Sequence, residues 1–478
     1  MLNLELLHFI MVALITLRVV SRRAASGVAM SWLFLVAALP FFGVVLYLLF
    51  GERRISRHRQ RNLQHLREDF YGSPVMAATA VPVDWASLPT EAEELEHVAN
   101  GVLGSRATTG CRYSLLTDAR EVTSKIASDI HGASQSVCLG YYIWHPGGWV
   151  TEVVEALCDA AGRGVACRVL VDAVGSGDWM GSDEAKRLRV AGVRVESALQ
   201  VGPLRTLFAR IDMRLHRKIV LIDNQIAWTG SQNMADPRLF KQDRGVGQWV
   251  DAMVRVQGPV VASLGGVALA DWELETDESA MSLFQEHALD SVQVEGESAM
   301  LAFPSGPGLS GDALLQMLLV VLYSARQELV LTTPYLIPDE SLLRAIRVAA
   351  ARGVTVKLIV PENIDVVSAR HASRSYYDQL MELGVEVYLY QGGMLHTKSV
   401  TVDEQLAVFG SANLDMRSLW LNYEISLFVF DRAFCKDLRD LQADYIEHAH
   451  RIDPAEWANR SRWRRGLEDT VRLASALL

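Results

Sequence analysis

One set of six residues occurs twice in the chain at identical spacing. Each copy reads H-x-K-x4-D-x6-G-S-x-N, and the copies begin at His216 and His396. With residue frequencies of a few per cent, one such match arises by chance on the order of once in millions of windows. The pair therefore indicates a duplicated functional unit, and the alternative is a duplicated structural unit whose polar residues satisfy one another. The specified positions are His216, Lys218, Asp223, Gly230, Ser231 and Asn233, and His396, Lys398, Asp403, Gly410, Ser411 and Asn413.

These residue types suit chemistry on a phosphate group. His and Lys two positions apart on a strand project from the same face, so two such strands would set two imidazoles and two ammonium groups around one point. Lysine offers donors and positive charge, and an Asn amide adds a donor, so the set can hold a multiply oxygenated anion. A neutral imidazole can attack phosphorus, and a second, protonated imidazole can donate to the departing alkoxide. We expect Lys218, Lys398, Asn233 and Asn413 to bind the phosphate, with Ser231 and Ser411 as weaker supports.

Four carboxylates accompany the two motifs. Asp223 and Asp403 complete each motif and are counted with the catalytic set. Their offset of five from each lysine nevertheless favours a structural contact with an earlier part of the chain over a contact with phosphate. Asp251 and Glu424 occupy comparable places further downstream. Each could bind the second nitrogen of a motif histidine and fix its tautomer. The alternative for these two is an ordinary carboxylate at the end of a strand.

No metal or cofactor is expected. The sequence has no carboxylate cluster with metal-ligand spacing, no Walker-type glycine-rich loop and no H-E-x-x-H. The motif lysines would instead neutralise the phosphate oxygens.

The paired motifs resemble the HKD motifs of the phospholipase D superfamily. The longer stretches from Leu215, from Leu395, from Tyr141 (YYIWHPGG) and from Thr332 (TTPYLIPDE) are similar to bacterial cardiolipin synthases, and so is the apolar N-terminal segment. This resemblance covers essentially the whole chain. It implies two similar α/β halves that share one active site, a covalent phosphohistidine intermediate, and one histidine that acts as acid and then as base. By analogy the nucleophile would be His216.

The N-terminal segment predicts a membrane anchor. Residues 24–51 carry no charge, and 28 residues of helix would extend roughly 40 Å, more than the ~30 Å hydrocarbon thickness. We therefore expect one transmembrane helix there, tilted or bent at Pro40. The stretch from Leu2 to Val20 either spans the bilayer or lies at its interface.

Arginines predict the orientation of this anchor. Those that follow the span mark its cytoplasmic side, so the catalytic body should face the cytoplasm of a bacterial inner membrane. They also attract anionic lipid at roughly 1 kcal/mol per charge. Arg22 and Arg23, between the two apolar segments, argue against a periplasmic turn and leave a conflict. The arginines after the span are Arg53, Arg54, Arg57, Arg59, Arg61 and Arg67.

The rest of the chain repeats an α/β pattern twice. Each half has an apolar strand, a helix that ends at Arg-Gly (Arg163-Gly164 and Arg352-Gly353) and a second apolar strand. Continuous apolar strands suit a sheet covered on both faces. The predicted fold is α/β, with two phospholipase D-like sandwich halves related by pseudo-twofold symmetry. The predicted domains are 1–60 (anchor), 61–285 and 286–478, with the boundary between the halves at 277–298.

Several further features concern the substrate. The run from Leu204 to Arg214 mixes basic and bulky apolar residues, which suits either a lipid-binding mouth or a solvated loop. The tail from Trp457 to Leu478 could rest on the bilayer or dock on the body. Five aromatic residues would line the pocket or, for at least half of them, pack in the core: Tyr141, Tyr142, Trp144, Trp149 and Tyr335.

Composition narrows the cellular context. A net charge of −10 argues against nucleic acid as a partner of the body. The five cysteines lack CxxC spacing and predict buried thiols in a reducing compartment. The sequence leaves open whether the chain forms a homo-oligomer.

The resemblance favours a membrane-anchored phosphatidyltransferase that makes cardiolipin and glycerol from two phosphatidylglycerol molecules. A phospholipase D-type hydrolase would have the same pocket and differ in how well it excludes water, so it stays an alternative. A catalytically silent scaffold that binds anionic lipid is an alternative of another class.

Overall fold

The computed structural model describes residues 2–21, 26–51, 55–200, 210, 212–286 and 293–473. The chain divides into two compact units. The first is formed by Met1–Gln60 and Val201–Met213, and the second by Arg61–Gln200 and Arg214–Ala476. Most of the predicted lipid-binding run from Leu204 falls outside the described residues.

The first unit contains three apolar helices: α1 (Leu2–Ser21), α2 (Ser26–Ala38) and α3 (Phe42–Phe50). Among the described helices, α1 has the length and apolar composition to cross a membrane, over Leu4–Ser21. At about 1.5 Å per residue, α2 and α3 are each too short for a ~30 Å hydrocarbon core. The continuous helix predicted over 24–51 is therefore wrong, because two short helices form there and the chain breaks at Pro40, where the sequence predicts a bend. The N-terminal stretch forms the long helix instead.

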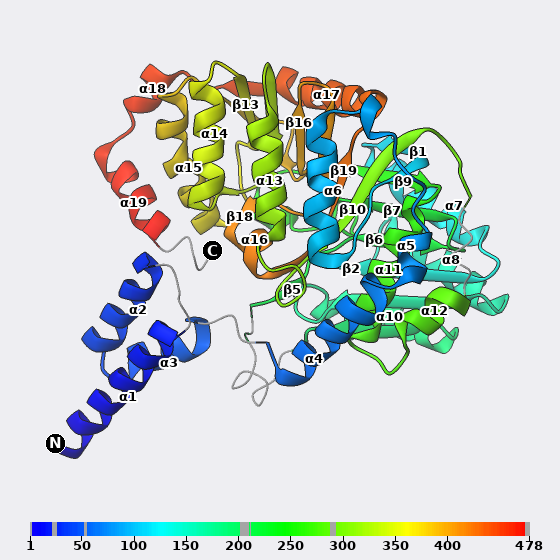
Figure 1. Cartoon of the computed structure of the whole chain (residues 1–478), viewed down its shortest axis with the longest axis horizontal. Coiled ribbons are helices and arrows are strands. Elements are labelled where there is room, and N and C mark those ends of the chain that lie inside the picture. The colour runs from blue at the N-terminus through cyan, green and yellow to red at the C-terminus, as the bar shows by residue number, and fades with distance from the viewer. Residues whose placement is uncertain are drawn as a thin grey trace. The chain divides into compact units, whose positions relative to one another are not determined.

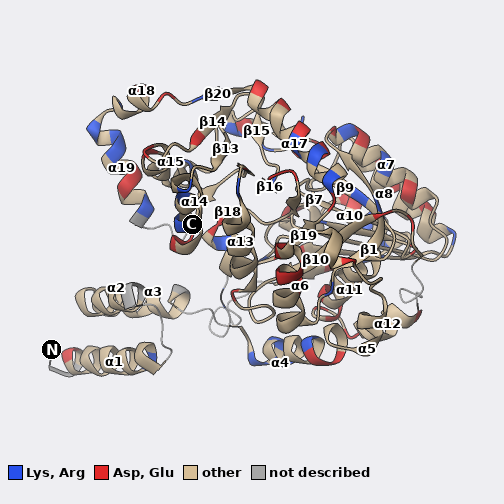
Figure 2. Ribbon diagram, turned by 45° about the horizontal axis from the view of Figure 1, so that its top comes forward, with Lys and Arg blue, Asp and Glu red and all other residues tan. Residues whose placement is uncertain are grey.

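The chain folds back on itself between α2 and α3. Pro40 cannot continue a helix, and the next residue, Phe41, takes a left-handed backbone with φ 60°. The rings of Trp32 and Tyr47 then lie 5.6 Å apart, although a straight helix would hold them more than about 20 Å apart. Gly43 permits the close approach, because a Cβ there would lie 2.4 Å from the carbonyl oxygen of Leu35. Figure 2 shows α2 and α3 without Lys, Arg, Asp or Glu over their described length.

Short helices lead from the first unit into the second, which then forms the first repeated half. The opening elements are α4 (Arg57–His65), a π-helical turn (Leu66–Tyr71), α5 (Pro74–Ala78) and α6 (Thr90–Leu103). The first half is β1 (Thr108–Leu116), α7 (Ala119–His131), β2 (Ser136–Tyr141), α8 (Val150–Gly162), β3 (Ala166–Asp172), α9 (Gly177–Met180), α10 (Asp183–Val190), β4 (Arg194–Ala198), β5 (Arg214–Leu215), β6 (Ile219–Ile222), β7 (Ile226–Gly230), β8 (Trp249–Val250), β9 (Met253–Gln257), α11 (Val260–Glu273) and α12 (Ala280–Glu286).

The second half repeats this order and adds a C-terminal extension. Its elements are β10 (Ser298–Ser305), α13 (Ala313–Ser324), β11 (Glu328–Thr332), β12 (Leu336–Ile337), α14 (Glu340–Ala351), β13 (Thr355–Pro361), α15 (Val367–Met381), β14 (Glu386–Tyr390), β15 (Met394–Leu395), β16 (Ser399–Val402), β17 (Leu406–Gly410), β18 (Leu414–Asp415), α16 (Met416–Trp420), β19 (Asn422–Val429), α17 (Arg432–Glu447), β20 (Ala449–Arg451), α18 (Pro454–Ala458) and α19 (Arg462–Leu473).

One continuous sheet runs through both halves (Figure 1). Its order is β20-β14-β13-β11-β16-β17-β19-β10-β1-β9-β7-β6-β2-β3-β4. Read outwards from the antiparallel β1–β10 pair, the first half runs 9-7-6-2-3-4 and the second runs 19-17-16-11-13-14. The two series match strand for strand, so the structure has the repeated α/β arrangement that the sequence predicts.

Helices cover the strands as the apolar pattern requires. In β2, Val137 and Leu139 join the hydrophobic core that α7 and α8 build, whereas Cys138 between them is buried near Asp271 of α11. Successive residues of β2 thus point to opposite faces of the sheet, and helices cover both faces. All five cysteines lie in the described chain and are free, and Cys158 alone is partly exposed.

The predicted helix stops are confirmed in both halves. Helices α8 and α14 end beside Gly164 and Gly353, whose φ values are 91° and 86°. The arginine before each glycine donates to main-chain carbonyls at the end of the preceding helix: Arg163 to His131 and Ala133, and Arg352 to Tyr323 and Ala325. The two halves therefore repeat this polar contact as well as their apolar pattern.

The C-terminal tail docks on the body over its described part. Helix α19 packs along α15, and Arg460 lies 3.8 Å over the ring of Trp457 and 2.7 Å from Asp378. Trp463 on α19 stays exposed.

Candidate active site

Each motif histidine is held by the opposite half of the protein. Strand β5, just before His216, pairs in parallel with β19, and strand β15, just before His396, pairs with β8. The main-chain N–H of His216 donates to Tyr423 at 2.9 Å, and that of His396 donates to Val250 at 2.8 Å. The strand pairing therefore brings each histidine to a carboxylate one residue further along the partner strand.

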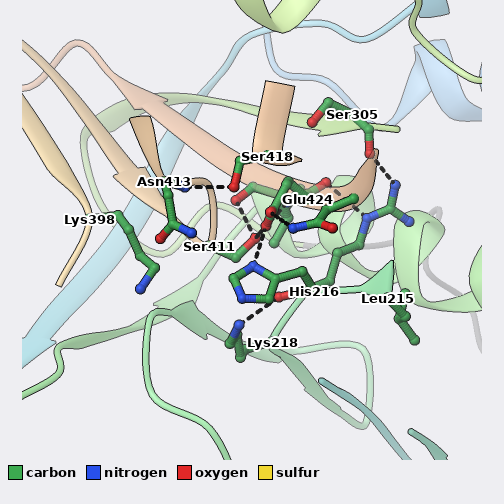
Figure 3. Close-up of polar contacts among 12 residues, drawn as sticks. Leu215, His216, Lys218, Ser305, Lys398, Ser411, Asn413, Ser418 and Glu424 are labelled. Atoms are coloured by element: carbon green, nitrogen blue, oxygen red, sulfur yellow. Dashed lines mark hydrogen bonds and ion pairs between the residues drawn. The ribbon is translucent and has the colours of Figure 1, made fainter. Parts of the chain in front are cut away.

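The two histidine–carboxylate contacts are made across the halves. His216 Nδ1 lies 2.8 Å from Glu424 Oε2 (Figure 3), and His396 Nδ1 lies 2.7 Å from Asp251 Oδ1. Neutral imidazoles would donate from Nδ1, which leaves each Nε2 for a ligand. The structure thus assigns to Glu424 and Asp251 the contact that the sequence predicts and fixes which carboxylate serves which histidine.

Ser231 and Ser411 hold the carboxylates, which corrects the expectation that they support phosphate. Their hydroxyls donate to Asp251 and Glu424, each at 2.6 Å. They also accept from the main-chain N–H groups of Ala252 and Ile425. Both serines are fully buried, and their donor is already used.

The motif glycines bring these serines close to the neighbouring strand. A Cβ at Gly230 would lie 2.4 Å from the carbonyl oxygen of Ala252, and one at Gly410 would lie 2.3 Å from that of Ile425. Strands β7 and β17 therefore need glycine at this point to approach β9 and β19.

Both motif lysines are buried beside the histidines. Lys218 Nζ donates to the main-chain carbonyl of His216 at 2.7 Å, and Lys398 Nζ donates to that of His396. Figure 3 shows the two lysines and Asn413 gathered around the His216 ring. Burial lowers the pKa of Lys218 to about 8 and the pKa of Lys398 well below its usual value, while the nearby carboxylates oppose this shift.

Burial also keeps both histidines neutral. It lowers the pKa of His216 to about 4 and that of His396 to about 3, and the lysine charges add to the shift while Glu424 and Asp251 oppose it. Burial raises the pKa of each of these carboxyls, but the facing histidine, a motif lysine and the serine hydrogen bond together outweigh it and leave the pKa below its usual value. The site at neutral pH thus holds two neutral imidazoles, each against an ionised carboxylate.

Asn233 and Asn413 line the same cavity as the two histidines. Each is buried and has an Oδ1 with no hydrogen-bond partner among the described residues. The amide nitrogen of Asn413 donates to Asp415 at 2.9 Å. A phosphate contact of the two asparagines stays a prediction.

Asp223 and Asp403 lie outside this cavity, which corrects their place in the catalytic set. Asp223 accepts from the main-chain N–H groups of residues 134–136 at the start of β2, and Asp403 accepts from those of residues 326–328 at the start of β11. Each takes a left-handed backbone, with φ 47° and 51°. Both close a tight turn, as their odd offset from the lysines favours.

The shared cavity has a volume of about 400 Å³. Of the five aromatic residues singled out in the sequence, Tyr142 and Tyr335 line it. Tyr141 and Trp144 are core residues, and Trp149 lies under the guanidinium of Arg238. Arg214, the last residue of the predicted lipid-binding run, also lines the cavity. Sequence reasoning missed several other lining residues, because none is an identical residue repeated in both halves: Lys241, Trp249, Asp365, Asp415, Arg417 and Asn422.

Comparison with known families agrees with this geometry. The family model described as "Cardiolipin synthase, PLD-like domain" matches residues 126–256 and 318–444, one match in each half. The chain belongs to this family. A second model, "Phospholipase_D-nuclease N-terminal", matches residues 9–52, which cover most of α1 and all of α2 and α3.

Curated relatives extend the similarity over the full length. The chain is 40% identical over 471 residues to a protein named cardiolipin synthase A from Erwinia tasmaniensis, and 41% identical over 482 residues to one from Serratia proteamaculans. Each alignment covers 98% of this chain and 97% of the relative. The cardiolipin synthase family is one of enzymes, phosphatidyltransferases of the phospholipase D type, and this chain is a membrane-anchored member.

A solved structure shares the fold. The chain superposes on the phosphatidylserine synthase of Haemophilus influenzae Rd KW20 with a TM-score of 0.62 and 14% sequence identity. The superposition covers 80% of this chain and all of that one.

Proposed function

We propose that this enzyme transfers a phosphatidyl group from one phosphatidylglycerol to the terminal hydroxyl of a second, giving cardiolipin and glycerol. The observation that carries the proposal is the pair of buried, neutral histidines that line one cavity with their Nδ1 atoms held by carboxylates. This arrangement provides two Nε2 atoms for one phosphorus.

In the first step, Nε2 of His216 attacks the lipid phosphorus, and the bond to glycerol breaks. His396 gives its proton to the departing glycerol oxygen. It can carry that proton once the anionic substrate is bound, because the phosphate charge opposes the burial and the lysine charges that lower the pKa of His396. Lys218 and Lys398 hold the phosphate oxygens.

In the second step, the terminal hydroxyl of another phosphatidylglycerol attacks the phosphatidyl-histidine. His396, now neutral, takes the hydroxyl proton, and the P–N bond to His216 breaks. One phosphodiester replaces another, so the reaction needs no external energy source. Glu424 and Asp251 keep their histidines in the required tautomer and stabilise the imidazolium of whichever ring is protonated.

The anchor supports a cytoplasmic position for the catalytic body. In this proposal, the fold-back of α2 onto α3 puts the start of α2 and the end of α3 on one side of the membrane, and α1 is the helix that crosses. Arg22 and Arg23 precede α2, and Arg53 and Arg54 follow α3; these four lie outside the described residues. Both groups then satisfy the positive-inside rule at once, which removes the conflict in the sequence pattern.

Product analysis tests this function. Purified full-length protein in phosphatidylglycerol vesicles should release cardiolipin and glycerol in equal amounts, measured by mass spectrometry and a glycerol assay. Phosphatidic acid in place of cardiolipin would show a hydrolase with the same pocket. Absence of turnover, in protein that still binds the vesicles, would support the scaffold alternative.

A further inference from the structure

The two sides of the shared cavity differ chemically, although the catalytic motifs repeat. Strand pairs Trp144–Met234 and Leu336–Leu414 are equivalent in the two halves, so the cavity residue Tyr335 corresponds to Ile143. By the same spacing from the carboxylates, Trp249 corresponds to Asn422. The neighbourhood of His396 is therefore not a copy of that of His216.

Three polar side chains meet on the His396 side of the cavity. Lys241 Nζ donates to Asp365 Oδ2 at 2.9 Å, and the Tyr335 hydroxyl donates to Asp365 Oδ1 at 2.6 Å. Lys241 comes from the first half, and the other two come from the second. All three line the cavity, and none belongs to the repeated motif.

The cluster is tied to His396 through Trp249. The Trp249 ring lies 4.4 Å from the His396 ring, and Lys241 Nζ lies 5.1 Å from the centre of the Trp249 ring. Burial by itself raises the pKa of Asp365, but Lys241, Tyr335 and the nearby His396 outweigh it, and the pKa stays below its usual value. Asp365 is thus an ionised carboxylate on the side where the second alcohol must approach.

The backbone at Lys241 is unusual for a lysine. Its φ is 49°, in the left-handed region that residues other than glycine, asparagine and aspartate seldom adopt. Such a conformation costs energy, and residues that keep it cluster at functional sites, where the surrounding structure maintains the backbone. Its side chain is still 34% exposed, whereas that of Asp365 is 2% exposed, so the ammonium can meet a ligand that enters the cavity.

From this geometry we infer that Asp365, Lys241 and Tyr335 form the subsite for the acceptor headgroup, a glycerol bearing a phosphodiester. The inference rests on the proposed function, in which His396 deprotonates the acceptor hydroxyl. Each Asp365 oxygen keeps an acceptor position for the second glycerol hydroxyl, and Lys241 keeps N–H donors for the acceptor phosphate. Water and a simple alcohol such as ethanol have neither a second hydroxyl for Asp365 nor a phosphodiester for Lys241, so the subsite favours transfer to the acceptor lipid over hydrolysis.

The ratio of phosphatidic acid to cardiolipin measures how the phosphatidyl-enzyme divides between water and the acceptor. Full-length D365N and K241M should raise this ratio about tenfold each, because each loses a charged hydrogen bond to the acceptor. K241R keeps the positive charge, so its ratio of phosphatidic acid to cardiolipin should be close to that of the wild type. The products are measured by mass spectrometry in phosphatidylglycerol vesicles.

A matched ion pair outside the cavity supplies the control. Lys436 and Asp440 on α17 lie 2.7 Å apart and are exposed, so K436M and D440N should leave the ratio unchanged. An unchanged ratio in D365N and K241M, with both products falling together, would overturn the subsite and indicate a merely structural cluster. Wild-type protein that forms no cardiolipin would instead overturn the proposed function, and the subsite with it.

Discussion

Nδ1 of His396 lies 2.7 Å from Oδ1 of Asp251, although 145 residues separate them and they belong to different halves of the protein. The reciprocal pair, His216 and Glu424, spans 208 residues. Neither half therefore contains a complete histidine–carboxylate pair, and the site exists only when the two halves are docked. This exchange explains why one active site needs both copies of the motif.

Neutralising either carboxylate should slow the reaction without unfolding the protein. D251N and E424Q should each lower kcat about 10- to 100-fold, because the histidine loses the group that fixes its tautomer. S231A and S411A should lower it less, since they remove one hydrogen bond to each carboxylate. Circular dichroism checks folding, and unchanged kcat in both D251N and E424Q would contradict the role of these pairs.

A donor with a good leaving group should separate the two histidines. H396N should lower turnover of phosphatidylglycerol about 10²- to 10⁴-fold through loss of the general acid. With a p-nitrophenyl ester of phosphatidic acid, which needs no acid, H396N should still release one equivalent of p-nitrophenol in a burst. H216N should show no burst, and the opposite pattern would exchange the two roles.

The sequence predicts the repeated motif residues and the fold well because both depend on local spacing. It finds Asp251 and Glu424 but not their partners, because pairing across the halves is a property of docking. It misplaces Ser231 and Ser411, since only the approach of β7 to β9 and of β17 to β19 turns their hydroxyls to the carboxylates. It misses Asp365 and Lys241 because no repeat marks them.

The motif aspartates should matter for stability and not for chemistry. Asp223 accepts three main-chain N–H groups, so D223N should lower the free energy of unfolding by about 1–3 kcal/mol. D223A should cost more, because alanine tolerates the left-handed backbone less well than asparagine. Thermal unfolding measures the loss of stability in each variant. An assay of the protein that remains folded measures kcat, which should stay close to the wild-type value. A loss of kcat in stably folded D223N would return the residue to the catalytic set.

Stability should fall as the pH drops from about 6.5 towards 4.5. His216 and His396 stay neutral in the folded protein, with pKa values of about 4 and about 3, whereas in the unfolded chain they bind protons below about 6.5. The unfolded state then binds more protons, so folding loses about 2 to 3 kcal/mol per histidine by pH 4.5. Thermal unfolding in detergent across this range should show a weaker pH dependence in H216Q/H396Q. An equal slope in wild type and variant would contradict the neutral buried histidines.

Accessibility of introduced cysteines should reveal the fold of the anchor in the membrane. Our arrangement puts the N-terminus outside and both ends of the α2–α3 hairpin inside, because α1 alone crosses. In a variant without the native cysteines, N3C should react with a membrane-impermeant maleimide in intact cells. S26C and Q60C should react only after permeabilisation. If S26C and Q60C instead reacted from opposite sides, residues 26–51 would cross the bilayer, and the hairpin would have to open in the membrane.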